Sequence, residues 1–325
     1  MKIFAYEVRP DEAACFERLR QERGVEIILS GEVPTLDNAA LTAGCEGVTM
    51  LGQGRIDAAL LDAYHSFGVR YLSTRTIGYN HIDIEHARKI GIHVCNADYA
   101  PNGVAEYTIM LMLLCLRHYK PSLWRINVND FSLGGLQGRE LRNLTVGVVG
   151  TGSIGKQVIR TLQGFGCRIL AYSRHPDPKV DAEYVDLDTL YAQSDLITYH
   201  TALTPETFHM VNGESIAKMK NGVIIVNSAR GPLMDSAALV EAVERGKIGA
   251  LGLDCIEKEE GIYHKNHRDD IISNRDMAYL RQFPNVVMTP HMAFYTDAAV
   301  ESMVQCGVEG ILEMAETGTY RNMLV

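Results

Sequence analysis

Short hydrophobic runs rich in β-branched residues alternate with helical patterns along the whole chain, which is typical of an α/β protein with parallel sheets. In the first hundred residues these runs predict strands at Lys2–Tyr6, Val25–Leu29, Gly47–Met50, Val69–Ser73 and His93–Asn96. A second series predicts strands at Thr145–Val149, Arg168–Tyr172, Leu196–Tyr199, Val223–Asn227, Ala250–Asp254 and Val286–Thr289. One architecture is used twice, so we expect two Rossmann-like or flavodoxin-like domains with a cleft between them.

Helical patterns occupy the segments between these strands, among them Asp11–Arg23, Asp57–Phe67 and Asp83–Ile90. A longer pattern at Pro101–Tyr119 is apolar on nearly every side, so we expect it to be buried, either between domains or against a second subunit. The segment Lys120–Arg142 is predicted to be irregular, and a final helix at Ala298–Ala315 can pack back on the first domain. We therefore place a discontinuous substrate domain at residues 1–99 and 296–325, and a dinucleotide-binding Rossmann domain at residues 100–295.

The composition is that of an ordinary globular protein. Of 325 residues, 46% are hydrophobic and 22% charged, which excludes a disordered or fibrous chain. The formal net charge of −9 argues against a folded protein that binds nucleic acid. The seven cysteines are scattered without a CxxC spacing, and the longest apolar run is much shorter than the roughly 20 residues that cross a bilayer. Since the first residues also lack a signal-peptide pattern, we expect a cytoplasmic protein without a membrane partner.

The strongest local motif is a G-x-G-x-x-G pattern between a predicted strand and a helical pattern. It consists of Gly150, Thr151, Gly152, Ser153, Ile154 and Gly155. In that context the glycines let the chain turn tightly and approach a pyrophosphate at a helix N-terminus. The alternative is a purely structural turn. We predict that the loop binds a dinucleotide cofactor.

The strand that follows this loop ends at Ser173 and Arg174, where an acidic residue would normally bind the ribose 2′-hydroxyl of NAD. No acid stands there. Ser173 can hydrogen-bond a 2′-phosphate and Arg174 can pair with it; the alternative is an exposed turn with an unrelated arginine. The turn favours NADP(H) over strict NAD(H), and we expect NADP(H), NAD(H) or both as cofactor.

Three residues with useful chemistry follow neighbouring predicted strands. Arg230 comes after Val223–Asn227, Glu259 after the strand that ends at Asp254, and His291 after the last strand. Ligands bind at the carboxyl edge of open α/β sheets, so these side chains can converge. Arginine offers a fork for a carboxylate, and histidine titrates near neutral pH. Taken singly, Arg230 and Glu259 are ordinary surface charges, so the prediction depends on their joint placement.

The chain also resembles the D-2-hydroxyacid dehydrogenase family over nearly its whole length. The resemblance is carried by VGVVGTGSIG, NSARGPLMD with the Glu259 loop, TPHMAFYT, STRTIGYNHID and NADYAPNGVAEYT. HMAFYT and YAPN are closer to the D-lactate dehydrogenase branch than to the glycerate branches. The SRH turn and the STRTIG stretch resemble D-lactate dehydrogenases of vancomycin-resistance clusters.

The resemblance implies roles for residues of this sequence. His291 is the implied general acid/base, Glu259 its carboxylate partner and Arg230 the substrate-binding arginine. The implied substrate contacts are Ile77, Gly78, Tyr99 and Phe294; for the two aromatic residues, ordinary packing is the alternative. Besides the glycine loop and the turn after it, the implied cofactor contacts are His200, Thr201, Ala229 and Asp254. A proline that many members carry is replaced by Ala202, and Asp254 can instead be a strand-end cap.

The expected reaction is the NAD(P)H-dependent reduction of a small 2-oxo acid such as pyruvate to the D-2-hydroxy acid. Branched or aromatic 2-oxo acids are the alternative substrates. A non-enzymatic NAD(H)-sensing interaction protein, or another enzyme on this fold such as a formate dehydrogenase, are the alternative functions. The polar loop with His264, His267, Asp269 and Asp270 is interpreted as solvated surface, so we expect no metal. We expect a homodimer, since the apolar helix at 101–119 needs a partner surface.

Overall fold

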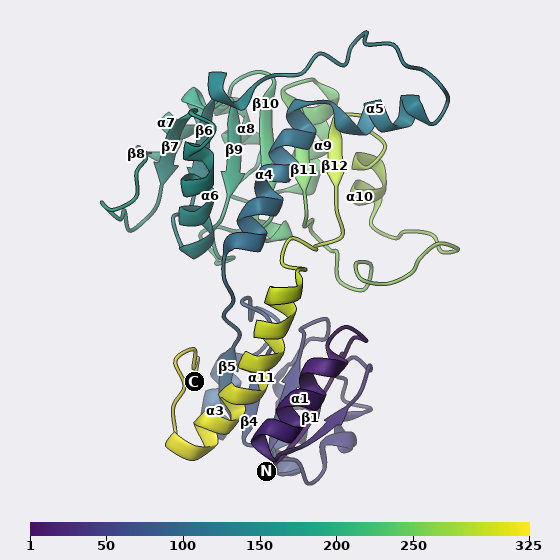
Figure 1. Ribbon diagram of the computed structural model, residues 1–325, viewed down its shortest axis with the longest axis vertical. Coiled ribbons are helices and arrows are strands. Elements are labelled where there is room, and N and C mark those ends of the chain that lie inside the picture. The colour runs from purple at the N-terminus through teal and green to yellow at the C-terminus, as the bar shows by residue number, and fades with distance from the viewer. The chain divides into compact units, whose positions relative to one another are not determined.

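The computed structural model describes all 325 residues, which divide into two compact units (Figure 1). Unit 1 comprises Met1–Ala100 and Tyr295–Val325, and unit 2 comprises Pro101–Phe294. Each unit has its own parallel sheet, covered by helices on both faces. The predicted α/β class with two parallel-sheet domains is confirmed.

Unit 1 is built on a five-stranded parallel sheet in the order β2-β1-β3-β4-β5. Its strands are β1 (Lys2–Ala5), β2 (Glu26–Leu29), β3 (Gly47–Met50), β4 (Tyr71–Thr74) and β5 (His93–Asn96). Its helices are α1 (Ala13–Arg23), α2 (Ala58–Ser66), α3 (Ile84–Ile90) and α11 (Asp297–Thr317), with a short 3-10 turn at Ala39–Thr42.

The alternation of β1 shows how the two faces of this sheet are covered. Ile3 and Ala5 point into a core with residues of α1 and α11 such as Phe16 and Ile311. Phe4 points to the other face, into a core with residues of α2 and α3. Successive side chains of a strand face opposite ways, so a strand covered on both sides is apolar throughout.

Unit 2 is built on a seven-stranded parallel sheet in the order β12-β11-β10-β9-β6-β7-β8. Its strands are β6 (Thr145–Val149), β7 (Arg168–Tyr172), β8 (Glu183–Tyr184), β9 (Leu196–Tyr199), β10 (Val223–Asn227), β11 (Ile248–Leu253) and β12 (Val286–Met288). Its helices are α4 (Asn102–Leu116), α5 (Tyr119–Ile126), α6 (Ser153–Gln163), α7 (Leu187–Gln193), α8 (Gly213–Lys218), α9 (Ser236–Glu244) and α10 (Arg275–Leu280), with 3-10 turns at Leu141–Asn143 and Gly231–Leu233.

The strand order of unit 2 places a switch point between β6 and β9. From β6 the chain proceeds outward through β7 to β8, and from β9 it proceeds the other way to β12. The helices α4 and α6 cover one face of the sheet, and α7 to α10 cover the other (Figure 1). In open parallel sheets ligands bind where the strand order reverses, outside the carboxyl ends of the strands. The loops after β6 and β9 lie at that point.

Two expectations about the segment between the strand series are wrong. The helix predicted at Pro101–Tyr119 ends at Leu116, because His118 adopts φ of +48° and a second helix, α5, begins at Tyr119. The helix is also not buried on every side: Met110 and Leu113 are 37% and 36% exposed. The predicted irregular stretch therefore begins with a helix, since a proline near the first turn, here Pro121, is compatible with one.

The remaining differences in unit 2 are small. The two-residue strand β8 was not predicted, because so short an edge strand has no hydrophobic pattern of its own. β11 begins at Ile248 rather than Ala250, and β12 ends at Met288 rather than Thr289. No helix in the structure combines the length and the apolar character that crossing a membrane requires.

Candidate active site

Three glycines shape the turn between β6 and α6, and each meets a different constraint. Gly150 has φ of +96°, and a Cβ there would lie 2.5 Å from the carbonyl oxygen of His200. A Cβ on Gly155 would lie 2.0 Å from the carbonyl oxygen of Gly150, so this glycine lets α6 pack closely on the turn. Gly152 faces open space, with nothing within 4 Å of an added Cβ. A bare stretch of backbone at the start of α6 fits the close approach of a pyrophosphate.

The other members of the motif hold this turn in place. The side chain of Thr151 is buried, and its hydroxyl accepts a hydrogen bond of 3.0 Å from the Tyr184 hydroxyl. Tyr184 in turn accepts a 3.2 Å bond from the backbone N–H of Asp177. Ser153 is exposed and Ile154 half-buried, both in the first turn of α6. The contacts of Thr151 therefore join the glycine turn to the segment that follows β7.

That segment carries the two residues predicted to select the cofactor. The Ser173 hydroxyl lies 3.3 Å from both the N–H and the carbonyl oxygen of His175, which closes a local turn. Arg174 is exposed. A hydrogen bond from Thr204, with a smaller contribution from Arg174, lowers the pKa of Glu206. The arginine therefore lies near the loop that follows β9, and its charge is only partly offset there.

His200 and Thr201 begin the loop after β9, at the switch point of the sheet. The imidazole Nε2 of His200 lies 3.0 Å from the hydroxyl of Thr198. Burial lowers the pKa of His200 to about 3, so the ring is neutral near pH 7. Thr201 packs close to Gly150, since its methyl carbon would lie 2.9 Å from an added Cβ there. These two residues form one wall of the glycine turn.

Arg230 lies in a turn fixed by its neighbours. The Asn227 side chain accepts a 3.0 Å hydrogen bond from the N–H of Ala229 and donates one of 2.9 Å to the Arg230 carbonyl oxygen. Next to it, a Cβ on Gly231 would lie 2.2 Å from the backbone of Ile256, so the chain must pass closely here. The guanidinium donates to the Ala229 carbonyl oxygen at 2.6 Å and forms no salt bridge with a carboxylate. Arg230 is thus a half-buried cation available to an anionic ligand.

Asp254 directly follows β11 and holds the loop that carries His291. Its carboxylate is fully buried and accepts hydrogen bonds from the Thr289 hydroxyl at 2.6 Å and the N–H groups of Met292 and Ala293 at 2.9 and 2.8 Å. Its carbonyl oxygen accepts a further 2.7 Å bond from the N–H of His291. In this structure Asp254 organises the loop, and its contact with a cofactor stays a prediction.

Glu259 and His291 form a hydrogen-bonded histidine–carboxylate pair in the loops after the neighbouring strands β11 and β12. The imidazole Nδ1 donates to Oε1 of Glu259, and Oε2 of the same carboxylate accepts a 2.8 Å bond from the N–H of Ile256. The side chains are 17% and 27% exposed, so both are shielded yet reachable. Since Nδ1 is engaged, Nε2 is the nitrogen left to face a substrate.

Two aromatic side chains lie beside this pair. His264 donates from Nε2 to the carbonyl oxygen of His291 at 3.0 Å, and its ring meets the rings of His291 and Phe294 edge-on, both at 6.3 Å between centroids. Interpreting the His264 segment as plain solvated surface was therefore incomplete. Nothing in its polar surroundings signals this contact, which joins residues 27 apart. The Phe294 ring thus lies beside the His264 ring, and its contact with substrate stays a prediction.

A buried thiol, Cys255, lies among the charged residues that follow β10 and β11. Burial first, and then the charges of Glu259 and Asp254, raise the pKa of Cys255, while Arg230 acts in the opposite direction. The thiol is therefore protonated at neutral pH, and the charges of Glu259, Asp254 and Arg230 all act on it. β10, β11 and β12 are neighbours and parallel, so the residues after them share one edge of the sheet.

A second histidine–carboxylate pair involves Glu257, two residues before Glu259, and was not predicted. His209 donates from Nε2 to Glu257 at 2.6 Å, and the other oxygen of Glu257 accepts a 3.1 Å bond from the N–H of Ser236. Glu257 therefore has a partner of its own and does not compete for His291. Only the fold brings residues 48 apart in sequence together, so no local pattern indicates the pair.

The remaining predicted substrate residues lie in unit 1. The carbonyl oxygen of Ile77 accepts a 2.7 Å bond from the Asn96 side chain, and that of Gly78 accepts a 2.6 Å bond from the Thr76 hydroxyl. Tyr99 is half-buried. These bonds fix the turn after β4, while the role of the three residues in binding substrate stays a prediction.

The chain is similar to known proteins over its full length. The family model for the D-isomer specific 2-hydroxyacid dehydrogenase, NAD binding domain, matches residues 109–293. An aromatic 2-oxoacid reductase of Clostridium sporogenes is 43% identical, over 100% of this chain and 99% of that protein. A D-lactate dehydrogenase of Escherichia coli is 34% identical over 100% of both chains.

A solved structure extends this similarity to three dimensions. The NAD-complexed form of a D-isomer specific 2-hydroxyacid dehydrogenase from Lactobacillus delbrueckii ssp. bulgaricus aligns with a TM-score of 0.86 at 29% identity, over 100% of both chains. The glycine turn of this chain, with its one open face at Gly152, fits such a dinucleotide.

Proposed function

This chain belongs to the D-isomer specific 2-hydroxyacid dehydrogenase family, and we propose that it reduces a 2-oxo acid with an apolar side chain to the D-2-hydroxy acid. It is an oxidoreductase that uses NAD(H). The observation that carries the proposal is the Glu259–His291 pair, on the same sheet edge as the half-buried Arg230, which has no carboxylate partner. A proton donor, its carboxylate and an anion-binding fork are what reduction of a 2-oxo acid requires.

In the proposed mechanism each of these residues has a separate task. Arg230 binds the substrate carboxylate through its fork and stabilises negative charge that develops on the neighbouring oxygen. His291 holds a proton at Nε2 and donates it to that oxygen, while Glu259 keeps the ring oriented through Nδ1. The bound nicotinamide supplies the hydride chemistry. The backbone of residues 150–155, with His200 and Thr201 beside it, would hold the dinucleotide.

The relatives suggest two classes of 2-oxo acid substrate, which differ in the side chain that the acid carries. The C. sporogenes relative, at 43% identity, is named for aromatic 2-oxo acids, which favours phenylpyruvate-like substrates. The E. coli relative, at 34%, is named for D-lactate, which favours the small acid pyruvate. We place the aromatic acids first, because the relative named for them is the more similar of the two, at 43% against 34% identity over the whole chain.

A panel of 2-oxo acids tests the proposal. Pyruvate, 2-oxobutyrate, 4-methyl-2-oxopentanoate and phenylpyruvate are each reduced with NADH, and the product is resolved on a chiral column. We expect the D-hydroxy acid and the highest kcat/KM for phenylpyruvate. A preference for pyruvate would replace the aromatic proposal with the small-acid one, and absence of turnover with every acid would overturn both.

We further propose that NADPH is accepted beside NADH. The residues directly after β7, Ser173 to His175, include no acid, and the exposed Arg174 can pair with a 2′-phosphate. Ser173→Asp should then lower kcat/KM with NADPH and preserve or improve it with NADH, because a carboxylate repels the phosphate and binds the free hydroxyl. Arg174→Ala should cost NADPH more than NADH, and Arg160→Ala, an exposed arginine of α6, is the matched control. Equal losses with both cofactors would remove the support for NADPH.

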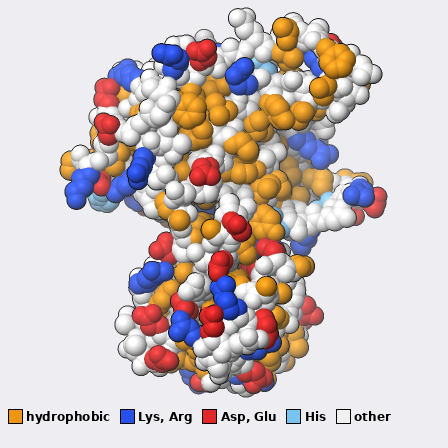
Figure 2. Space-filling model, in the orientation of Figure 1, with side chains coloured by type: hydrophobic (Ala, Val, Ile, Leu, Met, Phe, Trp, Pro, Cys, Tyr) orange, Lys and Arg blue, Asp and Glu red, His pale blue; other side chains and the backbone are white.

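We also propose that the protein is a homodimer. Seven large apolar side chains from α5 and the residues after it are 44–84% exposed: Tyr119, Leu123, Trp124, Ile126, Val128, Phe131 and Leu133. We call this set the apolar arm. Hydrophobic side chains gather over this part of unit 2 in Figure 2. Contiguous exposed apolar surface marks an interaction site, and a second copy is the commonest partner of such a surface.

A further inference from the structure

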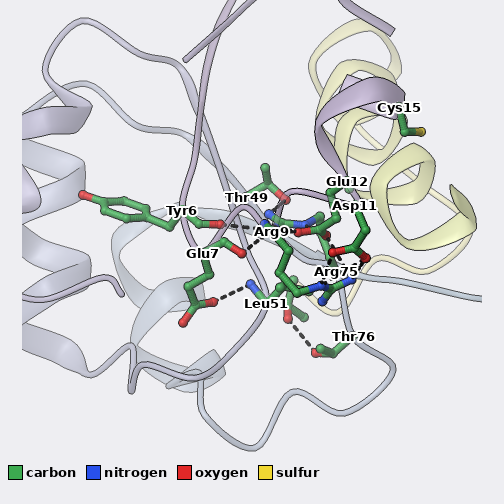
Figure 3. Close-up of polar contacts among 12 residues, drawn as sticks. Tyr6, Glu7, Arg9, Asp11, Glu12, Cys15, Thr49, Leu51, Arg75 and Thr76 are labelled. Carbon is green, nitrogen blue, oxygen red and sulfur yellow. Dashed lines mark hydrogen bonds and ion pairs between the residues drawn. The ribbon is translucent and has the colours of Figure 1, made fainter. Parts of the chain in front are cut away.

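A buried carboxylate in unit 1 is bound by four consecutive backbone N–H groups. Glu7, which follows β1, accepts from Leu51 and Gly52 through Oε2 at 2.5 and 2.7 Å. It accepts from Gln53 and Gly54 through Oε1 at 2.9 and 3.0 Å. The residue is 4% exposed, and Figure 3 shows its side chain directed at Leu51. We call residues 51–54 the nest, since successive N–H groups converging on one point form an anion site.

The backbone around this contact is held in unusual conformations. Glu7 has φ of +56°, uncommon for a residue with a side chain, and Gly52 has φ of +86°. β1 and β3 are neighbours in the sheet, so the nest, which follows β3, lies beside the end of β1. Burial raises the pKa of Glu7, while the N–H groups of the nest and the charge of Arg75 act against that rise. The hydrogen bonds that the carboxylate would make to water are thus replaced by hydrogen bonds from the protein.

A buried arginine fixes the chain on both sides of Glu7. The guanidinium of Arg75 is fully buried, pairs with Glu12 at 3.0 Å and donates to the carbonyl oxygens of Tyr6 and Glu7 at 3.0 and 3.4 Å (Figure 3). Arg75 follows β4 directly, so the ends of β1 and β4 are tied together. Glu7 is therefore a fixed point from which its side chain reaches the nest.

The nest is in turn attached to the turn predicted to bind the substrate carboxylate. Gly52 packs on the His81 ring so closely that a Cβ there would lie 2.6 Å from it. Two residues after the nest, Ile56 forms a parallel bridge with Ile82, and its N–H donates to the His81 carbonyl oxygen at 2.8 Å. The predicted contacts Ile77 and Gly78 precede His81 in the same segment. A shift of the nest is therefore transmitted to that segment.

We propose that Glu7 is a positioning residue: its carboxylate fills an anion site at residues 51–54 and thereby holds the substrate turn at Ile77 and Gly78 in place. The proposal rests on the proposed function, because it takes those two residues as the substrate's carboxylate contacts. When a substitution removes the Glu7 carboxylate, the empty nest should bind a small carboxylate from solution. In the wild-type protein the Glu7 carboxylate alone accepts the four N–H bonds of the nest.

The pairing pattern dictates which substitutions are informative. Each carboxylate oxygen accepts two N–H bonds, so glutamine, which has one acceptor oxygen, would turn its NH₂ group toward two donors. Glu7→Gln is therefore not conservative here. Glu7→Ala empties the nest, and Glu7→Asp keeps the charge one methylene short of it. Glu46→Gln is the matched control, since this exposed carboxylate precedes β3 at the opposite end of the strand.

The experiment measures kinetics, cofactor affinity and thermal unfolding of these variants with and without formate. We expect Glu7→Gln and Glu7→Ala to raise KM for the 2-oxo acid by about 10- to 100-fold, as misplaced binding groups do. The change in kcat should be smaller and the Kd for NADH, which unit 2 binds, unchanged. Formate should raise the Tm of Glu7→Ala and lower its KM, without effect on wild type or Glu46→Gln. Glu7→Asp should fall between wild type and alanine.

Each result decides between distinct conclusions. A KM within twofold of wild type in a folded Glu7→Ala would overturn the positioning role. A variant whose kcat falls as much as its KM rises, with neither change reversed by formate, would show that Glu7 has a structural role only. If Glu7→Ala does not fold, the KM of Glu7→Asp and its response to formate decide. Should wild type reduce no 2-oxo acid, formate-dependent stabilisation of Glu7→Ala still tests the nest, so the two proposals fail separately.

Discussion

At position 291 the backbone adopts φ of +50°, a conformation that residues other than glycine seldom occupy. The surrounding bonds impose it: the N–H of His291 donates to Asp254, and the N–H groups of the next two residues are bound by the Asp254 carboxylate. Unusual backbone geometry of this kind is retained where neighbouring structure over-determines it, and functional sites are common places for it. The placement of the proposed proton donor is thus set by a buried side chain rather than by the loop itself.

Replacing His291 by glutamine should remove proton transfer while leaving the fold intact. Glutamine is similar in size and can still bond to Glu259, but it does not donate a proton at neutral pH. We expect kcat for 2-oxo acid reduction to fall by about 10²- to 10⁴-fold, the usual contribution of a general acid. Titration of NADH fluorescence should give an unchanged Kd. Near-normal reduction by this variant would disprove the assignment.

Glu259→Gln tests the carboxylate partner through its two hydrogen bonds. One oxygen of Glu259 accepts from Nδ1 of His291 and the other from the N–H of Ile256. Glutamine has a single acceptor oxygen, so it can bind only one of these donors and the imidazole loses its fixed orientation. We expect kcat for reduction to fall, by no more than the roughly 10²- to 10⁴-fold that proton transfer contributes, with an unchanged Kd for NADH. Glu260→Gln, the next residue and an exposed one, is the control and should leave kcat unchanged. Wild-type kcat in Glu259→Gln would mean that this carboxylate does not position the proton donor.

At the scale of elements, the glycine turn before α6 contains one glycine that the packing requires and another that it does not. A Cβ at Gly155 meets backbone at 2.0 Å, whereas one at Gly152 meets nothing within 4 Å and φ there is −70°. Two glycines three positions apart in one motif thus have different reasons to be glycine. Gly155 lets the helix pack closely on the turn, and we propose that Gly152 leaves space for the ligand.

Gly152→Ala should therefore leave Tm unchanged and weaken cofactor binding, because the added methyl occupies the space that the pyrophosphate needs. Gly155→Ala should instead lower Tm, since backbone has to move. Thermal unfolding without cofactor and NADH titration of both variants check this. A Gly152→Ala variant that binds NADH as tightly as wild type would show that the dinucleotide does not approach the turn.

The elements also show what the sequence could predict. Buried parallel strands are nearly continuous hydrophobic runs, so Gly47–Met50, Thr145–Val149 and Val223–Asn227 were predicted at the bounds that the structure has. Residues after such strands must share an edge, which is why Arg230, Glu259 and His291 could be proposed together. The helix α5 was missed because its proline and the later glycines suggested a loop. The His209–Glu257 pair, the His264 contact and the nest of Glu7 join residues far apart in sequence, which no local pattern indicates.

For the whole molecule, the largest unpartnered feature is the apolar arm. Two of its members, Phe131 and Leu133, are 72% and 84% exposed. On a protein with a net charge of −9, such exposed apolar side chains stand out from the charged surface and mark an interaction site. The arm therefore accounts for the proposed dimer better than the helix α4, whose apolar residues are mostly used within unit 2.

A double change, Phe131→Asp with Leu133→Asp, should convert the dimer to a monomer, because two carboxylates at an apolar interface lose hydration without a partner. Light scattering after size exclusion should give 36.0 kDa for this variant and twice that for wild type. Ile271→Asp is the control: this apolar side chain is 96% exposed but lies outside the arm, and its loss should leave the mass unchanged. A monomeric wild type would contradict the proposal.

The discontinuity of unit 1 has a consequence for the order in which the protein matures on the ribosome. Its sheet is complete once residue 96 has emerged, yet one face is covered by α11, which begins at residue 297. Val304, Val308 and Ile311 have to wait for the synthesis of about two hundred intervening residues. Those residues are unit 2, which carries both of its own cores and can fold while the sheet of unit 1 is still half bare. We therefore expect unit 1, although it begins the chain, to complete its packing only after unit 2 has been synthesised.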